Sequence, residues 1–197
     1  MKTINLKSVF ILLVVLGLGT AAFAESYKVD KAGSSVKWTG KKVTGQHNGT
    51  ISFREGALDI TGGKPSGGVF LIDMNSIVCE DLTDADWNQK LIGHLKSDDF
   101  FSVEKYPVAK LVLTGVEAKG GKKYLFKGNL TIKGITHPVE FEATVNFSGN
   151  TASAAGTLVV DRTLYNVRYG SGKFFDSLGD KTIYDDFTLD FNVSASK

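Results

Sequence analysis

The residues best able to do chemistry form an aromatic and basic group between residues 162 and 175. Its members are Arg162, Tyr165, Arg168, Tyr169, Lys173, Phe174 and Phe175. Such side chains can stack on nucleic-acid bases, or they can surround the opening of an apolar cavity with positive charge. They can equally belong to an ordinary loop whose cations pair with Asp161, Asp176 and Asp180.

The charge balance disfavours the nucleic-acid interpretation. Of the 23 Lys and Arg residues, Lys2 and Lys7 fall within the first 24 positions, where there is no Asp or Glu. Residues 25–197 therefore carry 21 charged residues of each sign. Because a nucleic-acid-binding protein needs an excess of cations to displace counterions from phosphates, we expect no nucleic-acid partner.

The histidines give little support to an enzyme or a metal site. His47, His94 and His137 are 47 and 43 residues apart, without a second ligand at zinc-motif spacing, although residues distant in sequence can still meet in the fold. A hydrolase or isomerase would rest on His94 and Asp98 alone, and the adjacent Asp98 and Asp99 are more typical of a solvated turn than of a glycosidase pair. We predict a non-enzymatic protein that needs no cofactor and no metal.

The first 24 residues have the pattern of a secretory signal peptide. Lys2 and Lys7 precede the apolar run Val9–Leu18, and Ala22-Phe23-Ala24 provides a small-x-small cleavage site. A membrane anchor would need about 20 apolar residues. We therefore expect an exported, periplasmic or secreted protein that begins at Glu25 and is not stably inserted in a membrane.

A single cysteine, Cys79, excludes an internal disulfide bond, so an exported chain must be held together by its apolar core. Cys79 ends an apolar segment, and we expect it to be a buried small apolar residue rather than a reactive thiol.

Period-two alternation of apolar and polar residues dominates residues 25–197. It is clearest in residues 124–133, 139–147 and 186–193, where the apolar positions include Phe126, Phe141 and Phe191. Weaker alternation covers residues 34–43, 50–60, 69–74, 111–116 and 157–161. The pattern predicts a single all-β domain of about eight mostly antiparallel strands, each with one buried face. Alternation alone does not distinguish a barrel from a sandwich.

Residues from Thr83 to about Lys96 break this alternation and are predicted to form a short amphipathic helix. Thr83 and Asp86 resemble a capping box, and Trp87, Leu91 and Leu95 recur at helical spacing. His94 then lies at the edge of the apolar stripe.

Three blocks of the sequence resemble the YceI-like family of exported lipid-binding proteins. The most specific is residues 93–107, GHLKSDDFFSVEKYP. The other two are residues 27–38, which contain YKVD and SSVKW, and residues 161–170, which begin Asp161-Arg162 and end Arg168-Tyr169-Gly170. Together they span residues 26–193, which is almost the whole of the expected mature chain.

This resemblance implies a lipocalin-like antiparallel barrel of eight strands, with a helix beside its mouth and an apolar channel for a polyisoprenoid or fatty-acid-like lipid. We expect a polar mouth formed by His94, Arg162 and Arg168, with an apolar collar of Tyr165, Tyr169, Phe100 and Phe101. The channel itself is expected to contain Trp38, Phe126, Phe141 and Phe191. An interaction or stress-response module, with the barrel filled by its own side chains, shares this fold. Whether the protein forms a homodimer stays open.

Overall fold

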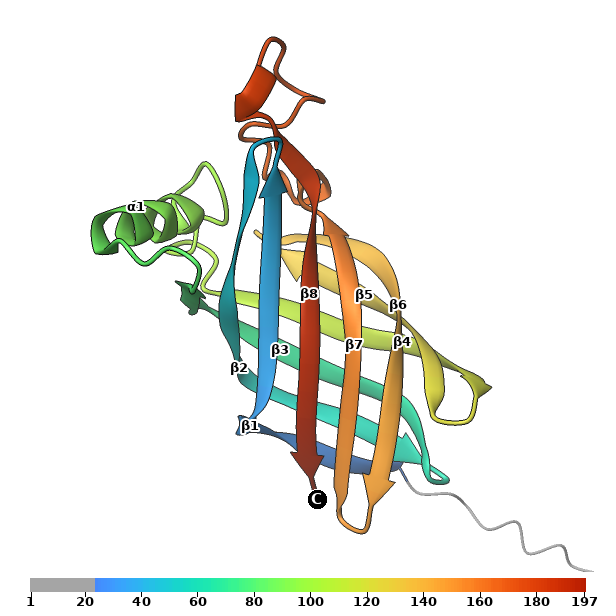
Figure 1. Cartoon of the computed structure of the whole chain (residues 1–197). Coiled ribbons are helices and arrows are strands. Elements are labelled where there is room, and N and C mark those ends of the chain that lie inside the picture. The colour runs from blue at the N-terminus through green and yellow to red at the C-terminus, as the bar shows by residue number, and fades with distance from the viewer. Residues whose placement is uncertain (1–23) are drawn as a thin grey trace, which may run out of the picture.

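A computed structural model describes residues 24–197 and places them in one closed antiparallel β-barrel (Figure 1). Of the predicted signal peptide, all but Ala24 lies outside the described residues. The strands and helices follow one another as β1 (Ala24–Lys42), β2 (Gly45–Thr61), β3 (Lys64–Cys79), α1 (Ala85–Lys96), β4 (Val108–Gly120), β5 (Lys123–Ile132), β6 (Ile135–Ser148), β7 (Thr151–Asp161), the 3-10 helices η1 (Arg162–Tyr165) and η2 (Gly179–Lys181), and β8 (Ile183–Ser196).

Closure of the sheet confirms the predicted fold class and decides for the barrel. Each strand pairs with the next strand in sequence, and β8 returns to pair with β1, with Trp38 opposite Leu189. A closed barrel has no exposed sheet edge, so every strand has both neighbours.

The period-two pattern explains how the barrel wall is built. In β5, the side chains of Tyr124, Phe126, Leu130 and Ile132 are buried, while alternate residues face outward. The register places Phe126 of β5 opposite Phe141 of β6. Gly156 in β7 leaves room for an aromatic ring, because a Cβ atom there would lie 2.9 Å from Cζ of Phe191.

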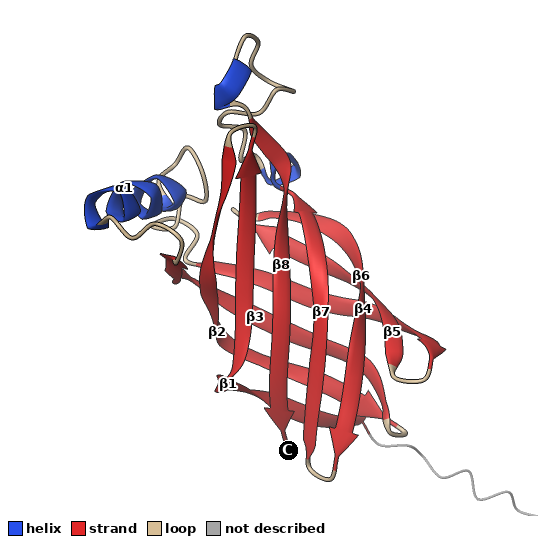
Figure 2. Cartoon of the chain, in the orientation of Figure 1, coloured by secondary structure: helices blue, strands red, loops and turns tan. Residues whose placement is uncertain are grey.

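The two ends of the barrel differ. The end near the C-terminus is packed by the barrel's own side chains, among them Ile60, Tyr124 and Val145, and Tyr27 meets Phe147 edge to face. All the helices gather around the opposite end (Figure 2). That end therefore contains the irregular segments whose residues the sequence singled out.

Helix α1 begins later than the capping box suggested. The N-cap is Asp84, whose carboxylate accepts a hydrogen bond from the backbone N–H of Trp87, and Thr83 lies outside the helix. A carboxylate is a stronger acceptor than a hydroxyl and is favoured by the helix dipole.

The apolar stripe of α1 is also shorter than predicted. The side chain of Leu95 in the last turn is buried, whereas Trp87 is 62% exposed and lies under the Lys90 ammonium group at 4.5 Å. The helix projects from the barrel (Figure 1), so its first turn has no wall to pack against. No helix within residues 24–197 has the length and apolar character needed to cross a membrane.

Candidate functional site

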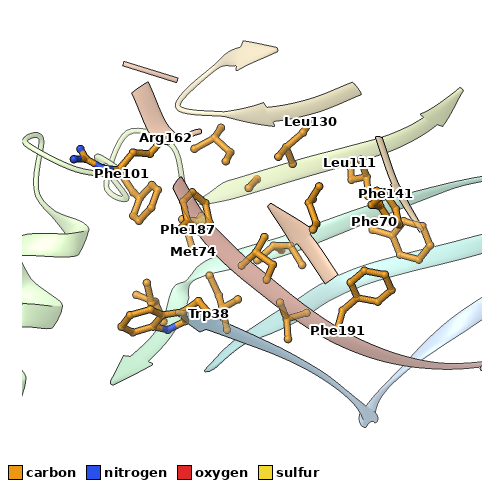
Figure 3. A pocket seen from close by; sticks show the side chains of 18 of the residues that line it. Trp38, Phe70, Met74, Phe101, Leu111, Leu130, Phe141, Arg162, Phe187 and Phe191 are labelled. Carbon is orange, nitrogen blue, oxygen red and sulfur yellow. The ribbon is translucent and has the colours of Figure 1, made fainter. Parts of the chain in front are cut away.

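The barrel encloses an apolar cavity of about 210 Å³. All eight strands contribute to its wall, and Figure 3 shows the side chains that point into it. The wall includes Phe53, Phe70, Met74, Leu111, Leu113, Leu130, Ala154, Leu158, Phe187 and Leu189. Native interiors contain few voids larger than a water molecule, and one water needs roughly 10–15 Å³ of such space. The cavity is therefore a distinctive feature and not ordinary packing imperfection.

The four aromatic residues expected in the channel all lie in the cavity wall: Trp38, Phe126, Phe141 and Phe191. Phe141 stacks on Phe126 with ring centroids 5.5 Å apart, and it meets Phe191 edge to face, also at 5.5 Å. The indole N–H of Trp38 donates to the carbonyl of Val78 at 3.0 Å, so the ring presents only its apolar surface to the cavity.

The cavity reaches the protein surface at one end, which we call the mouth and which is lined by Phe100, Phe101 and Arg162. Lys41, Tyr184 and Asp186 line the cavity and are also exposed to solvent. Figure 3 places Arg162 and Phe101 at the opposite end of the cavity from Phe70, Phe141 and Phe191. The site is thus a deep apolar channel with a charged group near its entrance.

Arg162 is the polar residue that the structure places most specifically. Although it is only 4% exposed, its guanidinium donates to the backbone carbonyls of Val167, Ile183 and Tyr184 at 2.7, 3.0 and 3.1 Å. Burial lowers the pKa of Arg162, and the nearby Asp185 and Asp161 carboxylates oppose that shift. Because an arginine stays protonated in proteins, a fixed positive charge lies beside an apolar cavity.

His94, Phe100 and Tyr169 come together as an aromatic cluster at the mouth. The His94 ring meets Tyr169 at 4.5 Å and Phe100 at 4.8 Å between centroids, both edge to face. Of the three, only Phe100 lines the cavity. The cluster connects α1 to the segment that follows it and to the segment that follows η1. His94 and Tyr169 therefore pack against Phe100 on the side away from the cavity.

The pairing of His94 with Asp98, which was the basis of a hydrolase hypothesis, is not present. Asp98 accepts hydrogen bonds from Ser102 and Lys105, and both lower its pKa. His94 instead lies 3.6 Å from Asp99 on the protein surface, outside the cavity wall. Residues four apart, such as His94 and Asp98, are neighbours on a continuous helix, but α1 ends at Lys96. The chain then turns, and Asp98 lies beside Lys105 instead.

Like His94 and Tyr169, two further residues expected at the mouth lie outside the cavity wall. Tyr165 is 1% exposed and packs edge to face on His137 at 5.3 Å, and burial raises its pKa to about 12. Arg168 lies over the ring of Phe174 at 4.6 Å in the following segment. Tyr165 was assigned to the collar as a member of the aromatic and basic group, and η1 is too short for periodicity to show which way its ring points.

Lys173 joins the mouth segments by contacting two carboxylates, of which the sequence indicated only that of Asp161. Its ammonium lies 2.9 Å from Asp161 and 3.1 Å from Asp185. Although burial alone would raise the pKa of Asp161, hydrogen bonds from Thr163 and Lys173 hold it below its ordinary value. The expected local pairing with Asp161 is therefore present, and Asp185, which is distant in sequence, completes it.

Comparison with known proteins places the chain in context. A family model described as the YceI-like domain matches residues 27–195. A UPF0312 protein of Pseudomonas putida is 34% identical over 145 residues, covering 68% of this chain and 72% of the relative. A UPF0312 protein of Pseudomonas fluorescens is 30% identical over 148 residues, covering 70% and 73%.

Solved structures show the same fold. BcnA of Burkholderia cenocepacia superposes with a TM-score of 0.64 at 28% identity, covering 85% of this chain and 99% of BcnA. A polyisoprenoid binding domain from Saccharophagus degradans, implicated in plant cell wall breakdown, superposes with a TM-score of 0.61 at 17% identity, covering 86% and 97%. The closed eight-stranded barrel and the family match over residues 27–195 together show that the chain belongs to the YceI-like domain family.

Proposed function

We propose that the protein binds a long-chain hydrophobic ligand, a polyisoprenoid or a fatty-acid-like lipid, inside the barrel and acts as a non-catalytic carrier or reservoir in the periplasm. The observation that carries the proposal is the apolar cavity of about 210 Å³ enclosed by all eight strands. The likeness to a polyisoprenoid binding domain supports the class of cargo, and the leader pattern of residues 1–24 supports export.

The energetic cost of an unfilled cavity favours a ligand over a merely structural barrel. The side chains around an unfilled space of about 210 Å³ lack van der Waals partners on their inner side. A hydrocarbon chain in the channel would supply these contacts, because it fills the space that the barrel's own side chains leave.

The geometry also favours one direction of entry. The tail would lie among Phe70, Phe141 and Phe191, and the polar head would stay near Arg162 at the mouth. Arg162 offers a positive charge to a phosphate or carboxylate head, and Lys41 lines the same end of the cavity.

Two neighbouring alanines in β7 provide a matched test. Ala154 lines the cavity, whereas Ala155 is exposed on the outer face of the same strand. We expect Ala154→Phe to weaken binding of a long-chain fatty acid or polyisoprenyl phosphate at least about tenfold by occupying the channel. Ala155→Phe should bind like the wild type. Native mass spectrometry of the purified protein, followed by titration of the delipidated protein, measures both.

The outcomes separate the proposal from its alternative. A stoichiometric lipid in the wild type that is lost in Ala154→Phe supports a channel ligand. Equal uptake by both folded variants contradicts the channel assignment. A wild-type protein that carries no lipid and refuses the whole panel would instead favour the interaction or stress-response module. If Ala154→Phe does not fold, the smaller Ala154→Leu change tests the same position.

A further inference from the structure

Three residues with metal-binding groups meet where the start of β2 lies beside the end of β3, away from the cavity wall. His47 lies near the start of β2, Cys79 is the last residue of β3, and Asp81 comes two residues after Cys79. Their side chains offer an imidazole nitrogen, a thiol sulfur and a carboxylate oxygen that all lie within 4.8 Å of one another. Sequence spacing did not reveal this group because only the pairing of β2 with β3 brings His47 to the other two.

The carboxylate of Asp81 is the centre of the group. Its Oδ2 lies 2.8 Å from Nδ1 of His47, and its Oδ1 accepts a hydrogen bond from Sγ of Cys79 at 3.3 Å. The backbone N–H of Asn48 also donates to Oδ1, at 2.8 Å. Asp81 is therefore held in place by the backbone while its oxygens face the other two groups.

The surrounding backbone fixes the three residues relative to one another. Gly49 pairs with Cys79, and the N–H of Glu80 donates to the carbonyl of Asn48 at 2.9 Å. A Cβ atom at position 49 would lie 1.9 Å from the carbonyl oxygen of Val78, so only glycine permits the two strands to approach this closely here. The amide of Asn88 in α1 donates to the carbonyls of Cys79 and Leu82.

We propose that His47, Cys79 and Asp81 form a binding site for a zinc ion. Tetrahedral zinc places its nitrogen and oxygen ligands about 3.4 Å apart and its oxygen and sulfur ligands about 3.6 Å apart. Here Nδ1 of His47 lies 2.8 Å from one Asp81 oxygen, and Sγ of Cys79 lies 3.3 Å from the other. Both pairs are shorter than in a zinc site, by roughly 0.3 to 0.6 Å, so a small outward rotation of the side chains would admit the ion.

The chemistry of the donors selects the kind of metal. A thiolate and an imidazole favour zinc over calcium or magnesium, which take oxygen ligands. With the thiol proton released, the thiolate and the carboxylate together balance the charge of a divalent ion. The side chains of His47 and Asp81 are 33% and 27% exposed, so the ion can enter from solvent and a water can complete its coordination. Through Asn88, the site would tie β2 and β3 to α1 beside the mouth.

The test uses the full mature protein without a histidine tag, reduced and stripped of metal with a chelator. Calorimetric titration with Zn²⁺ should give one site per chain. Titration with Co²⁺ should produce a sulfur-to-cobalt charge-transfer band in the near ultraviolet, which requires Cys79. At zinc concentrations 100 times the dissociation constant, the melting temperature should rise by roughly 5 °C or more.

Variants of each of the three residues test whether zinc binds at this site and not elsewhere on the protein. Cys79→Ser should abolish the cobalt band, and His47→Gln and Asp81→Asn should each weaken zinc binding by more than about tenfold. The matched control is the double variant His94→Gln and Asp99→Asn, which removes another surface histidine–aspartate pair, 3.6 Å apart, that has no thiol. Wild-type binding by the control supports the site.

Either of two results would overturn the proposal. The first is zinc uptake below one equivalent by the wild type. The second is uptake that survives in both Cys79→Ser and His47→Gln. Because His47 is partly exposed, its variant tests the site even if replacement of the buried Cys79 prevents folding.

Discussion

At the scale of single residues, Arg162 has a structural task as well as a place at the mouth. Its three hydrogen bonds connect η1 to the segment after it and to the start of β8. Three of the five N–H groups of the guanidinium are used in this way, and Nη2 also lies 3.9 Å from Oδ1 of Asp185. Arg162 therefore holds together the segments that form the mouth.

Replacing Arg162 should therefore be costly even without ligand. Arg162→Met leaves three carbonyls without their donor, and we expect it to lower the free energy of unfolding by about 3 kcal/mol or more. Arg168→Met, which removes a surface contact with Phe174, should stay within about 1 kcal/mol of the wild type. Urea denaturation of the delipidated proteins measures both, and equal losses would contradict the structural role of Arg162.

The residues that sequence could and could not assign differ in their surroundings. Alternation put Phe126, Phe141 and Phe191 on the buried faces of their strands, and the family resemblance implied that these faces line a channel. The structure places all three in the cavity wall. Tyr165 could not be placed from the sequence because it lies in a single turn of 3-10 helix, where no periodicity exists. The His47, Cys79 and Asp81 group could not be anticipated, because it depends on strand register.

At the scale of elements, the segment between η1 and β8 is held by Lys173. The ammonium lies between Asp161, which also caps η1, and Asp185 in β8. Asn166 and Ser177 in this segment have positive φ angles of 58° and 60°. Non-glycine residues rarely adopt this conformation, so the surrounding contacts must stabilise it. The ion pairs of Lys173 therefore help to position this segment.

The contacts of Lys173 with Asp161 and Asp185, which we call the clamp, predict that the free energy of unfolding depends on pH. The pKa of Asp161 is held below its ordinary value of 3.8, so the folded protein binds this proton less readily than the unfolded chain. The stabilisation is complete above that value and is lost as the pH falls through the folded pKa. At neutral pH we expect the free energy of unfolding of the wild type to exceed that of Asp161→Asn by on the order of 1 kcal/mol.

That advantage should shrink as the pH falls below about 3.8 and through the lower pKa that Asp161 has in the folded protein. Asparagine can still cap η1, so the variant isolates the charge. Asp176→Asn, in the same segment, is the control and should follow the wild type throughout. Thermal unfolding across the pH range gives the comparison, and a constant difference between wild type and Asp161→Asn would contradict the clamp.

At the scale of the whole molecule, the barrel is asymmetric along its axis. One end is filled by side chains such as Tyr27, Tyr124 and Ala152, and the other carries α1, η1, η2 and the charged mouth (Figures 1 and 2). An eight-stranded barrel is only just wide enough to hold a thin ligand in place of its own side chains. The architecture therefore favours a single extended chain over a compact, ring-shaped ligand.

A series of fatty acids that differ in chain length tests this asymmetry. While the tail still has channel to fill, each added methylene should strengthen binding by about 0.8 kcal/mol. Once the tail reaches the packed far end, further methylenes remain in solvent at the mouth, and the affinity should stop rising. In Ala154→Phe this plateau should come at a shorter chain, because the new ring blocks part of the channel, whereas Ala155→Phe should match the wild type. An affinity that rises without limit, or a plateau unmoved by Ala154→Phe, would place the ligand outside the barrel.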